Sequence, residues 1–189
     1  TVVVIGAKKK ATALKIQETF ANNYFRTYIS PDRKSIELGG SLKNVIALAA
    51  GIIDGLGFGD NTEAALITRR IKEITALGVK MGGHSRTFNG LSGIGDLIVT
   101  CNSKHSRNRR AGVLIGKGYT LDEAVKEVNM VVEGAVSAKA ALHLAKKYEV
   151  NMPIVEKVNE VLFDNEPAEK AMWELMNREQ TSEYSDLEW

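Results

Sequence analysis

Residues 103–110, in the middle of the chain, carry a dense positive charge: three arginines, one lysine and two serines lie within eight positions. The whole chain has a formal net charge of only +2, so this charge is local. The next residues, Ala111 to Ile115, are compatible with a helix that Ser106 or Asn108 could cap. A helix N-terminus beside an arginine fork has the parts of a phosphate-binding site.

Two other interpretations of this cluster remain open from its residues alone. The first is a solvated, charged helix face, which fits the cluster equally well. The second is a basic patch for nucleic acid. Against the second, no aromatic side chain interleaves with the arginines, and the rest of the chain is not basic.

Lys43 stands out because the segment from Leu38 to Ile53 is otherwise nearly uncharged. In a helix, Lys43 would share its face with Ala47, Ala50 and Gly51, whose small side chains let a ligand approach the amine. A lysine amine in such a place can act as a general base or as an anion-binding cation. The alternative is a lysine at a helix start whose stem covers apolar surface while its amine stays in water.

Two shorter motifs carry carboxylates. Gly93-Ile94-Gly95-Asp96 reads as a tight turn that delivers an aspartate, which could orient an ammonium group or accept a substrate hydroxyl. Taken alone, this pattern is more typical of a plain turn. Val131-Val132-Glu133-Gly134 begins another predicted helix, where Glu133 could simply complement the helix dipole.

The histidines and the cysteine do not suggest a metal. His84, His105 and His143 have no metal-ligand spacing with Cys101, so no metal site is expected. One cysteine cannot form a disulfide within the chain. This favours a reducing cytoplasm, although a cysteine-poor secreted protein fits as well.

The composition bounds the class of protein. The chain has 189 residues, 44% of them apolar, with 25 Lys+Arg against 23 Asp+Glu, which is ordinary for a globular protein of one domain or of one domain and part of another. Its apolar runs, such as Val45 to Ile53, are far shorter than the roughly 20 residues that cross a bilayer. No signal peptide is visible. Because the chain opens inside a predicted strand and without methionine, we expect it to begin within a larger protein.

The first part of the chain predicts a β-α-β unit. Val2 to Ile5 is a β-branched run that ends at Gly6, Ala11 to Phe20 has a helical apolar face, and Tyr24 to Ile29 reads as a second strand. A single unit of this kind cannot cover both faces of its sheet, so we expect it to need further strands.

After Glu37 the apolar period changes from two to about 3.6, which predicts an all-helical remainder. Helix starts are marked by capping boxes or prolines at four places: Asp60 to Glu63, Thr120 to Glu123, Pro153 and Pro167. Gly78 is the predicted stop of the helix that opens at Asp60. Residues 179–189 are acidic and aperiodic, and we expect them to be poorly ordered.

Seven motifs occur in an order and approximate spacing that resemble the bacterial NAD(P)-dependent glycerol-3-phosphate dehydrogenases. They are Glu37–Val45, Gly55–Gly59, Gly90–Leu97, Thr100-Cys101, Ser106–Arg110, Val131–Gly134 and Met152–Ile154. The resemblance implies a mainly α protein whose all-helical substrate domain, like the C-terminal domain of 6-phosphogluconate dehydrogenase, follows a β-α-β remnant of an α/β Rossmann domain. The implied parts are residues 1–37 for the remnant, 38–178 for the helical substrate-binding and catalytic domain, and 179–189 for an acidic tail.

The resemblance also implies a function. Such enzymes transfer a hydride between NAD or NADP and the pair glycerone phosphate and sn-glycerol 3-phosphate, for phospholipid synthesis in the cytoplasm. The implied partner is this small-molecule substrate, with no nucleic acid and no membrane. The sequence does not fix the oligomeric state, and a homodimer is compatible with it.

The site residues that the resemblance implies fall into three groups. Lys43 resembles the catalytic lysine that exchanges a proton with the C2 oxygen. The substrate-binding residues are Lys43, Asn44, Asp96 and Thr100, together with a phosphate clamp of Ser106, Arg107 and Asn108. The cofactor-binding residues are Arg107, Val131 and Glu133.

One departure from the family is large. The sequence contains no Gly-x-Gly-x-x-Gly/Ala turn after a strand, and it lacks the lysine that the family's nucleotide domain contributes to the substrate. We therefore expect the polypeptide as given to bind dinucleotide poorly and to be inactive without the missing part. The choice between NADH and NADPH stays open. Two rival functions are another sugar-phosphate or β-hydroxyacid dehydrogenase with a helical C-terminal domain, and a non-catalytic anion- or RNA-binding module.

Overall fold

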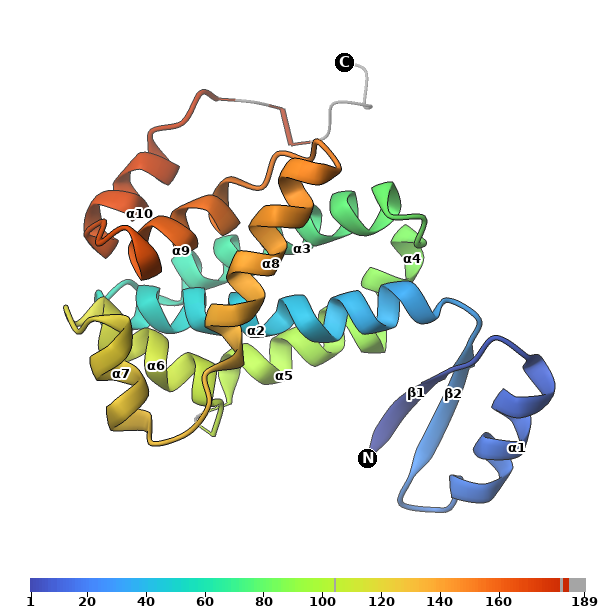
Figure 1. Ribbon diagram of the computed structural model, residues 1–189. Coiled ribbons are helices and arrows are strands. Elements are labelled where there is room, and N and C mark those ends of the chain that lie inside the picture. Colours follow the sequence, from blue (N-terminus) through green and yellow to red (C-terminus); the bar gives the residue numbers. More distant parts are fainter. Residues whose placement is uncertain (104, 181, 184–189) are drawn as a thin grey trace.

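The computed structural model describes residues 1–103, 105–180 and 182–183, in which a small β-α-β unit precedes a helical domain (Figure 1). The unit consists of β1 (Val2–Gly6), α1 (Lys10–Phe20) and β2 (Arg26–Ser30). The two strands are parallel, with Val2 opposite Arg26 and Gly6 opposite Ser30. The predicted β-α-β unit is therefore confirmed. Its second strand starts at Arg26 rather than Tyr24, because Asn22 and Phe25 first pair with each other in a tight antiparallel bridge.

The described remainder of the chain is helical, as predicted. Its elements are α2 (Arg33–Gly55), α3 (Asp60–Lys80), α4 (Ser85–Phe88), the π-helical turn η1 (Leu91–Gly95), α5 (Asp96–Asn102), α6 (Arg107–Gly116), α7 (Leu121–Val128), α8 (Glu133–Lys147), α9 (Pro153–Phe163) and α10 (Ala168–Met176). Helix α2 runs through the residue 37/38 boundary without a break. The division of the chain at that point stays a prediction.

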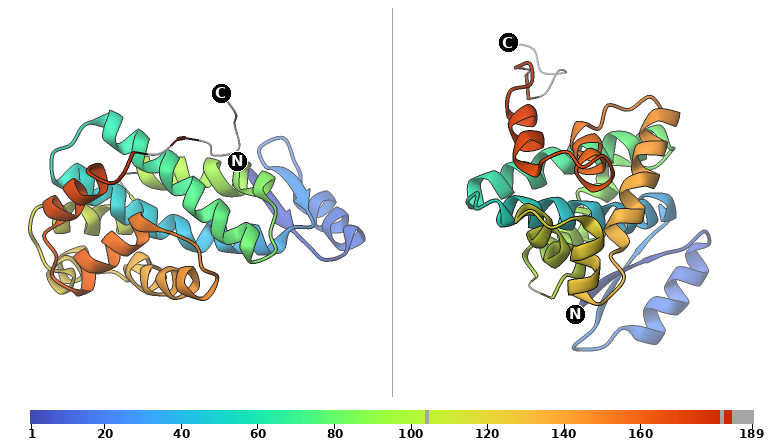
Figure 2. Two further views of the ribbon diagram at one scale, coloured as in Figure 1. Left: turned by 90° about the horizontal axis from the view of Figure 1, so that it is seen from above. Right: turned by 60° about the vertical axis from the view of Figure 1, so that its left-hand side comes forward.

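Helix α2 is the central element, and α3, α5, α6 and α8 pack around it (Figure 1). The views in Figure 2 place the β-α-β unit at one end of this helical assembly. By length and hydropathy α2 could cross a membrane. Every residue from Val45 to Ile53 is buried inside the protein, however, and this central position accounts for its apolar character.

Glycines bring the backbones of α2 and α6 into direct contact. A Cβ atom on Gly51 would lie 2.1 Å from the carbonyl oxygen of Arg109, and one on Gly112 would lie 2.1 Å from that of Leu48. Four residues further along both helices, Gly55 meets Gly116 in the same way. Because the residue numbers increase in the same direction along both helices from one contact to the next, the helices run parallel.

The start of α2 is held by Asp32, which caps the helix and ties it to α4. One carboxylate oxygen of Asp32 accepts the backbone N–H of Ser35 at 3.1 Å. The other accepts the N–H of His84 at 3.1 Å and the hydroxyl of Thr87 at 2.7 Å. Burial raises the pKa of Asp32, but these hydrogen bonds outweigh it and hold the pKa at about 2, below its ordinary value of 3.8.

Two local predictions for α3 are wrong. Asp60 to Glu63 do not form a capping box, because the N-cap is Gly59 and no side chain caps the helix. Gly78 does not stop the helix, which continues to Lys80 before the chain turns at Gly82 with a φ of +85°. Gly78 instead makes room for a buried ring, since a Cβ there would lie 2.1 Å from Phe88.

The predictions for the later helix starts agree better with the structure. The capping box at Thr120 is confirmed: Thr120 accepts the N–H of Glu123, and the Glu123 carboxylate accepts the N–H of Thr120 at 2.8 Å. Pro153 is the first residue of α9, as predicted. Pro167 is the N-cap of α10 rather than part of its first turn. Most of the acidic tail lies outside the described residues.

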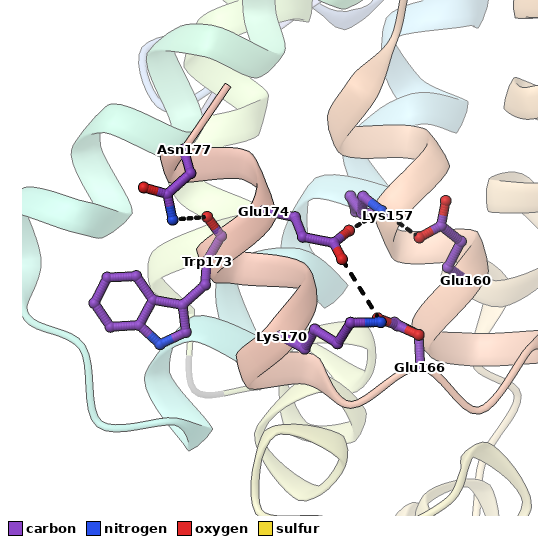
Figure 3. Close-up of polar contacts among 7 residues, drawn as sticks. All are labelled: Lys157, Glu160, Glu166, Lys170, Trp173, Glu174 and Asn177. Carbon is purple, nitrogen blue, oxygen red and sulfur yellow. Dashed lines mark hydrogen bonds and ion pairs between the residues drawn. The ribbon is translucent and has the colours of Figure 1, made fainter. Parts of the chain in front are cut away.

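Helix α10 closes the fold against α9 (Figure 3). Lys157 of α9 pairs with Glu174 of α10 and with Glu160, while Lys170 pairs with Glu166 at 2.6 Å. Ion pairs exposed to this degree contribute little individually. The attachment of α10 therefore depends mainly on its apolar face, and this end of the fold contributes no predicted site residue.

The α2–α6 contact predicts opposite effects for two glycine substitutions in α2. Gly51→Ala should lower the free energy of unfolding by about 1–3 kcal/mol, the usual cost of overpacking. Gly40→Ala is the matched control, because a Cβ there meets nothing within 4 Å. It should raise stability by about 0.5–1 kcal/mol through helix propensity. Urea denaturation followed by circular dichroism measures both, and equal stability of the two variants would contradict the contact.

The Asp32 cap predicts a pH dependence of stability. Its folded-state pKa is lowered, so its contribution is fully present above the ordinary pKa of 3.8 and is lost as the pH falls toward about 2. Asp32→Ala should cost about 1 kcal/mol at neutral pH, the usual cost of replacing a good N-cap by alanine. Urea denaturation at decreasing pH should show the difference between wild type and variant shrinking within this window. A difference that stays constant would argue against the carboxylate.

Candidate active site

The centre of the candidate site is an ion pair between α2 and α5. The Nζ atom of Lys43 lies 2.5 Å from Oδ2 of Asp96, and the two side chains are 27% and 38% exposed. Lys43 comes from the middle of α2 and Asp96 is the first residue of α5. The residues are 53 positions apart in the chain, so the fold itself brings this amine and this carboxylate together.

The backbone that delivers Asp96 differs from the predicted tight turn. Leu91–Gly95 form a π-helical turn that continues directly into α5. Neither Gly93 nor Gly95 has a positive φ. A Cβ on Gly93 would lie 2.0 Å from the carbonyl oxygen of Phe88, so glycine is needed there for close backbone packing rather than for a special turn conformation. Irregular turns of this type are frequent at functional sites.

Thr100 lies one helical turn after Asp96 and is partly buried. Its hydroxyl donates to the backbone carbonyl of Asp96 at 2.7 Å. Residues four apart share a helix face, so Thr100 lies on the same face of α5 as Asp96.

The basic cluster forms the N-terminus of α6. Ser106 is the N-cap, and its hydroxyl oxygen accepts the N–H of Arg109 at 3.3 Å. Of the two capping candidates, the structure thus selects Ser106. Arg107 and Asn108 are the first two helical residues, whose N–H groups have no partner inside the helix. With the positive end of the helix dipole, they make this terminus suited to an anion.

The arginines of the cluster have different surroundings. Arg109 turns back to α2 and pairs with Asp54 at 2.9 Å, so it belongs to the helix contact. Arg107 is partly buried and has no ion pair with the described part of the chain. Arg110 is exposed. Arg107 is therefore the arginine best placed to meet a ligand at the helix terminus.

The first turn of α8 contacts both α2 and α6. Asn44 of α2 donates from Nδ2 to the carboxylate of Glu133 at 3.3 Å. Asn108 of α6 accepts the N–H of Gly134 on Oδ1 at 2.8 Å, in a buried position. Val131, just before the helix, is 66% exposed and has no hydrogen bond with the described residues.

The structure thus connects most of the predicted site residues by direct contacts. Lys43 meets Asp96, Asn44 meets Glu133, and Asn108 reaches the residue after Glu133. Ser106, Arg107 and Val131 make no such contact within the described ranges and are placed only by their neighbours. Chemically, the arrangement offers an amine held by a carboxylate, with a helix N-terminus and an arginine at the neighbouring helix.

Gly134 is the site residue that sequence reasoning missed. It lies in the Val131–Gly134 motif, but no role was predicted for it. A Cβ at Gly134 would lie 2.7 Å from the carbonyl oxygen of Asn44 and 3.0 Å from Oδ1 of Asn108. Only the packing of α8 on α2 reveals this requirement, and no local pattern in the sequence signals it.

Known proteins resemble this chain over most or all of its length. A family model described as the NAD-dependent glycerol-3-phosphate dehydrogenase C-terminus matches residues 32–173. A glycerol-3-phosphate dehydrogenase of Agathobacter rectalis, named as acting with NAD(P)+, is 64% identical over 189 residues, which are 100% of this chain and 56% of that protein. One from Fusobacterium nucleatum is 63% identical over 183 residues, 97% of this chain and 55% of that protein.

Solved structures give the same picture. The crystal structure of glycerol-3-phosphate dehydrogenase from Coxiella burnetii matches with a TM-score of 0.90 and 36% identity, over 94% of this chain and 55% of that one. A Plasmodium falciparum glycerol-3-phosphate dehydrogenase matches with a TM-score of 0.85 and 25% identity, over 96% of this chain and 53% of that one. The chain spans about half the length of the curated relatives it matches.

Proposed function

The chain belongs to the family of the NAD-dependent glycerol-3-phosphate dehydrogenase C-terminus, and from this premise we propose that it is the substrate-binding and catalytic part of such an enzyme. The reaction is the interconversion of glycerone phosphate and sn-glycerol 3-phosphate with NAD or NADP, in the cytoplasm. The observation that carries the proposal is the ion pair of Lys43, on α2, with Asp96, on α5. Helix α2 also packs directly against α6, whose N-terminus carries the basic cluster.

Lys43 is the group that handles the proton in this proposal. When bound, the nicotinamide supplies or takes the hydride at C2 of the substrate. Lys43 gives a proton to the C2 oxygen in the reductive direction and removes it in the oxidative direction. Asp96 holds the amine in place through the 2.5 Å contact. Asn44 and Thr100 line the substrate beside this pair.

The phosphate of the substrate lies at the N-terminus of α6. A phosphate dianion accepts hydrogen bonds only, and this terminus supplies helix N–H groups, the Arg107 guanidinium and the Asn108 amide. Ser106 caps the helix and so fixes the direction of these donors. One amine for the reacting oxygen and several donors for the phosphate match a three-carbon phosphate.

The residues proposed to hold the cofactor are Arg107, Val131 and Glu133. They fit the group, because Val131 presents an apolar side chain that is 66% exposed beside the exposed carboxylate of Glu133. The sequence contains no Gly-rich phosphate-binding turn after β1. We therefore expect these 189 residues by themselves to bind dinucleotide poorly and to show no turnover.

The rival functions separate by simple measurements. A screen of phosphorylated and unphosphorylated hydroxy compounds with the natural protein distinguishes this substrate from other sugar phosphates and β-hydroxyacids. RNA binding with a steep salt dependence, together with no effect of sn-glycerol 3-phosphate on the melting temperature, would favour a non-catalytic module. We propose neither nucleic acid nor membrane as a partner. Light scattering of the natural protein measures whether it is a homodimer, which the sequence leaves open.

Replacing Lys43 tests the proposed acid–base role. In the natural protein, Lys43→Ala should lower kcat by about 10²–10⁴, the usual contribution of a positioned acid–base group. Lys43→Arg keeps a positive charge opposite Asp96 but stays protonated, so it should also be nearly inactive. Lys117→Ala, at an exposed lysine, is the control. Turnover of Lys43→Ala within about tenfold of wild type would refute the assignment.

Replacing Arg107 tests the phosphate clamp. Arg107→Leu should raise KM for glycerone phosphate by about 10–100-fold, because a charge-assisted bond of about 1.5–3 kcal/mol is lost. The KM for unphosphorylated glycerone should change much less. Arg110→Leu removes a neighbouring exposed arginine and should leave both values near wild type. An unchanged KM for glycerone phosphate in Arg107→Leu would rule out the clamp.

A further inference from the structure

Asn108 lies where α2, α6 and α8 meet, and its side-chain amide carries an acceptor and donors that can serve different partners. Its Oδ1 atom accepts the backbone N–H of Gly134 at 2.8 Å, and the residue is only 8% exposed. Its Nδ2 donors have no acceptor within the described ranges. We propose that Asn108, already placed in the phosphate clamp, is also a positioning residue for the turn of α8 that carries Val131 and Glu133, so that one amide serves both ligands. This inference rests on the proposed function.

The first function follows from how α8 begins. Its N-cap is Val132, which offers no side-chain hydrogen bond to the first turn. An apolar N-cap leaves the first N–H groups of a helix without a local acceptor. The acceptor for Gly134 comes instead from α6, through Asn108. The first turn of α8 is thus capped by a side chain from another helix.

Close packing makes this turn sensitive to Asn108. A Cβ on Gly134 would lie 2.7 Å from the carbonyl oxygen of Asn44, so the α8 backbone lies directly against α2, which it crosses in Figure 1. Asn44 also donates to Glu133 at 3.3 Å. The turn that carries Val131 and Glu133 is therefore held between α2 and α6. Among the described residues, two side chains from other helices hydrogen-bond to this turn, and loss of the bond from Asn108 removes one of them.

The second function follows from the first. Because the Gly134 N–H must face an acceptor, the amide of Asn108 is fixed with its oxygen toward α8. The amide then presents only N–H donors to a ligand. A phosphate oxygen accepts hydrogen bonds and does not donate them when ionised, so this orientation suits a phosphate.

Two substitutions separate these functions. Asn108→Asp keeps an oxygen for Gly134 but replaces the donor with a second oxygen, whose charge repels a phosphate. Asn108→Ala removes both. The readouts, in the natural protein, are the dissociation constants of NADH and NADPH and that of sn-glycerol 3-phosphate. They require no turnover.

Asn108→Asp should keep the dissociation constant of the cofactor within about twofold of wild type. It should raise the dissociation constant of sn-glycerol 3-phosphate by about tenfold or more. Asn108→Ala should raise the dissociation constants of both ligands. That of the cofactor should rise by about fivefold or more, because the buried N–H of Gly134 loses its acceptor. Asn151→Asp and Asn151→Ala, at an exposed asparagine away from the site, are the matched controls and should change neither constant.

Cofactor binding of Asn108→Ala at the wild-type level would overturn the positioning role. Equal loss of cofactor affinity in Asn108→Asp would overturn it too, and this second result remains decisive if Asn108→Ala does not fold. Unchanged affinity of Asn108→Asp for sn-glycerol 3-phosphate would overturn the role of the Nδ2 donor. A wild-type protein that binds neither ligand would instead refute the proposed function, and this inference with it.

Discussion

Along α2 and α6, carbonyl oxygens of one helix lie against the Cα atoms of the other, with no side chain between them. Such an approach is possible only where both helices carry glycine, and Gly51 and Gly55 face Gly112 and Gly116 at the same four-residue spacing. Two backbones in contact cannot slide without collision, so this contact fixes the register of α6 on α2. The first turn of α6 then lies beside the turn of α2 that follows Lys43. The distance between the proposed proton donor and the proposed phosphate site is therefore set by backbone packing.

Beyond the glycine contact, side-chain hydrogen bonds and an ion pair join further elements to α2 and α6. Asp32 anchors the start of α2 on α4, Asp96 fixes the amine of Lys43, and Asn108 holds the first turn of α8. Each bond joins elements far apart in the chain. A site assembled in this way is rigid, because tightly packed helices do not deform continuously. This rigidity suits a reaction in which an amine and a phosphate-binding group must act at a fixed separation.

The parts of the fold that were predictable from sequence are those with a local cause. The capping box at Thr120 forms from residues that contact only each other, and the apolar period alone predicts that the remainder after residue 37 is helical. The failures at Gly78 and Gly93 have the opposite origin, since a packed partner decides each outcome: Phe88 occupies the space beside both glycines. The family resemblance supplied the site residues, but Gly134 had no assigned role because its neighbours lie 90 and 26 positions away in the chain.

The basic cluster shows why composition alone could not assign its arginines. Arg107 and Arg109 differ by two positions, which is a rotation of about 200° around a helix axis. Once the glycine contact turns one face of α6 toward α2, Arg109 meets Asp54 on that side and its charge is neutralised within the fold. Arg107 must then point elsewhere, beside the open N–H groups of the helix terminus. The register of α6 on α2 thus places Arg109 in an ion pair with Asp54 and leaves Arg107 available for an anion.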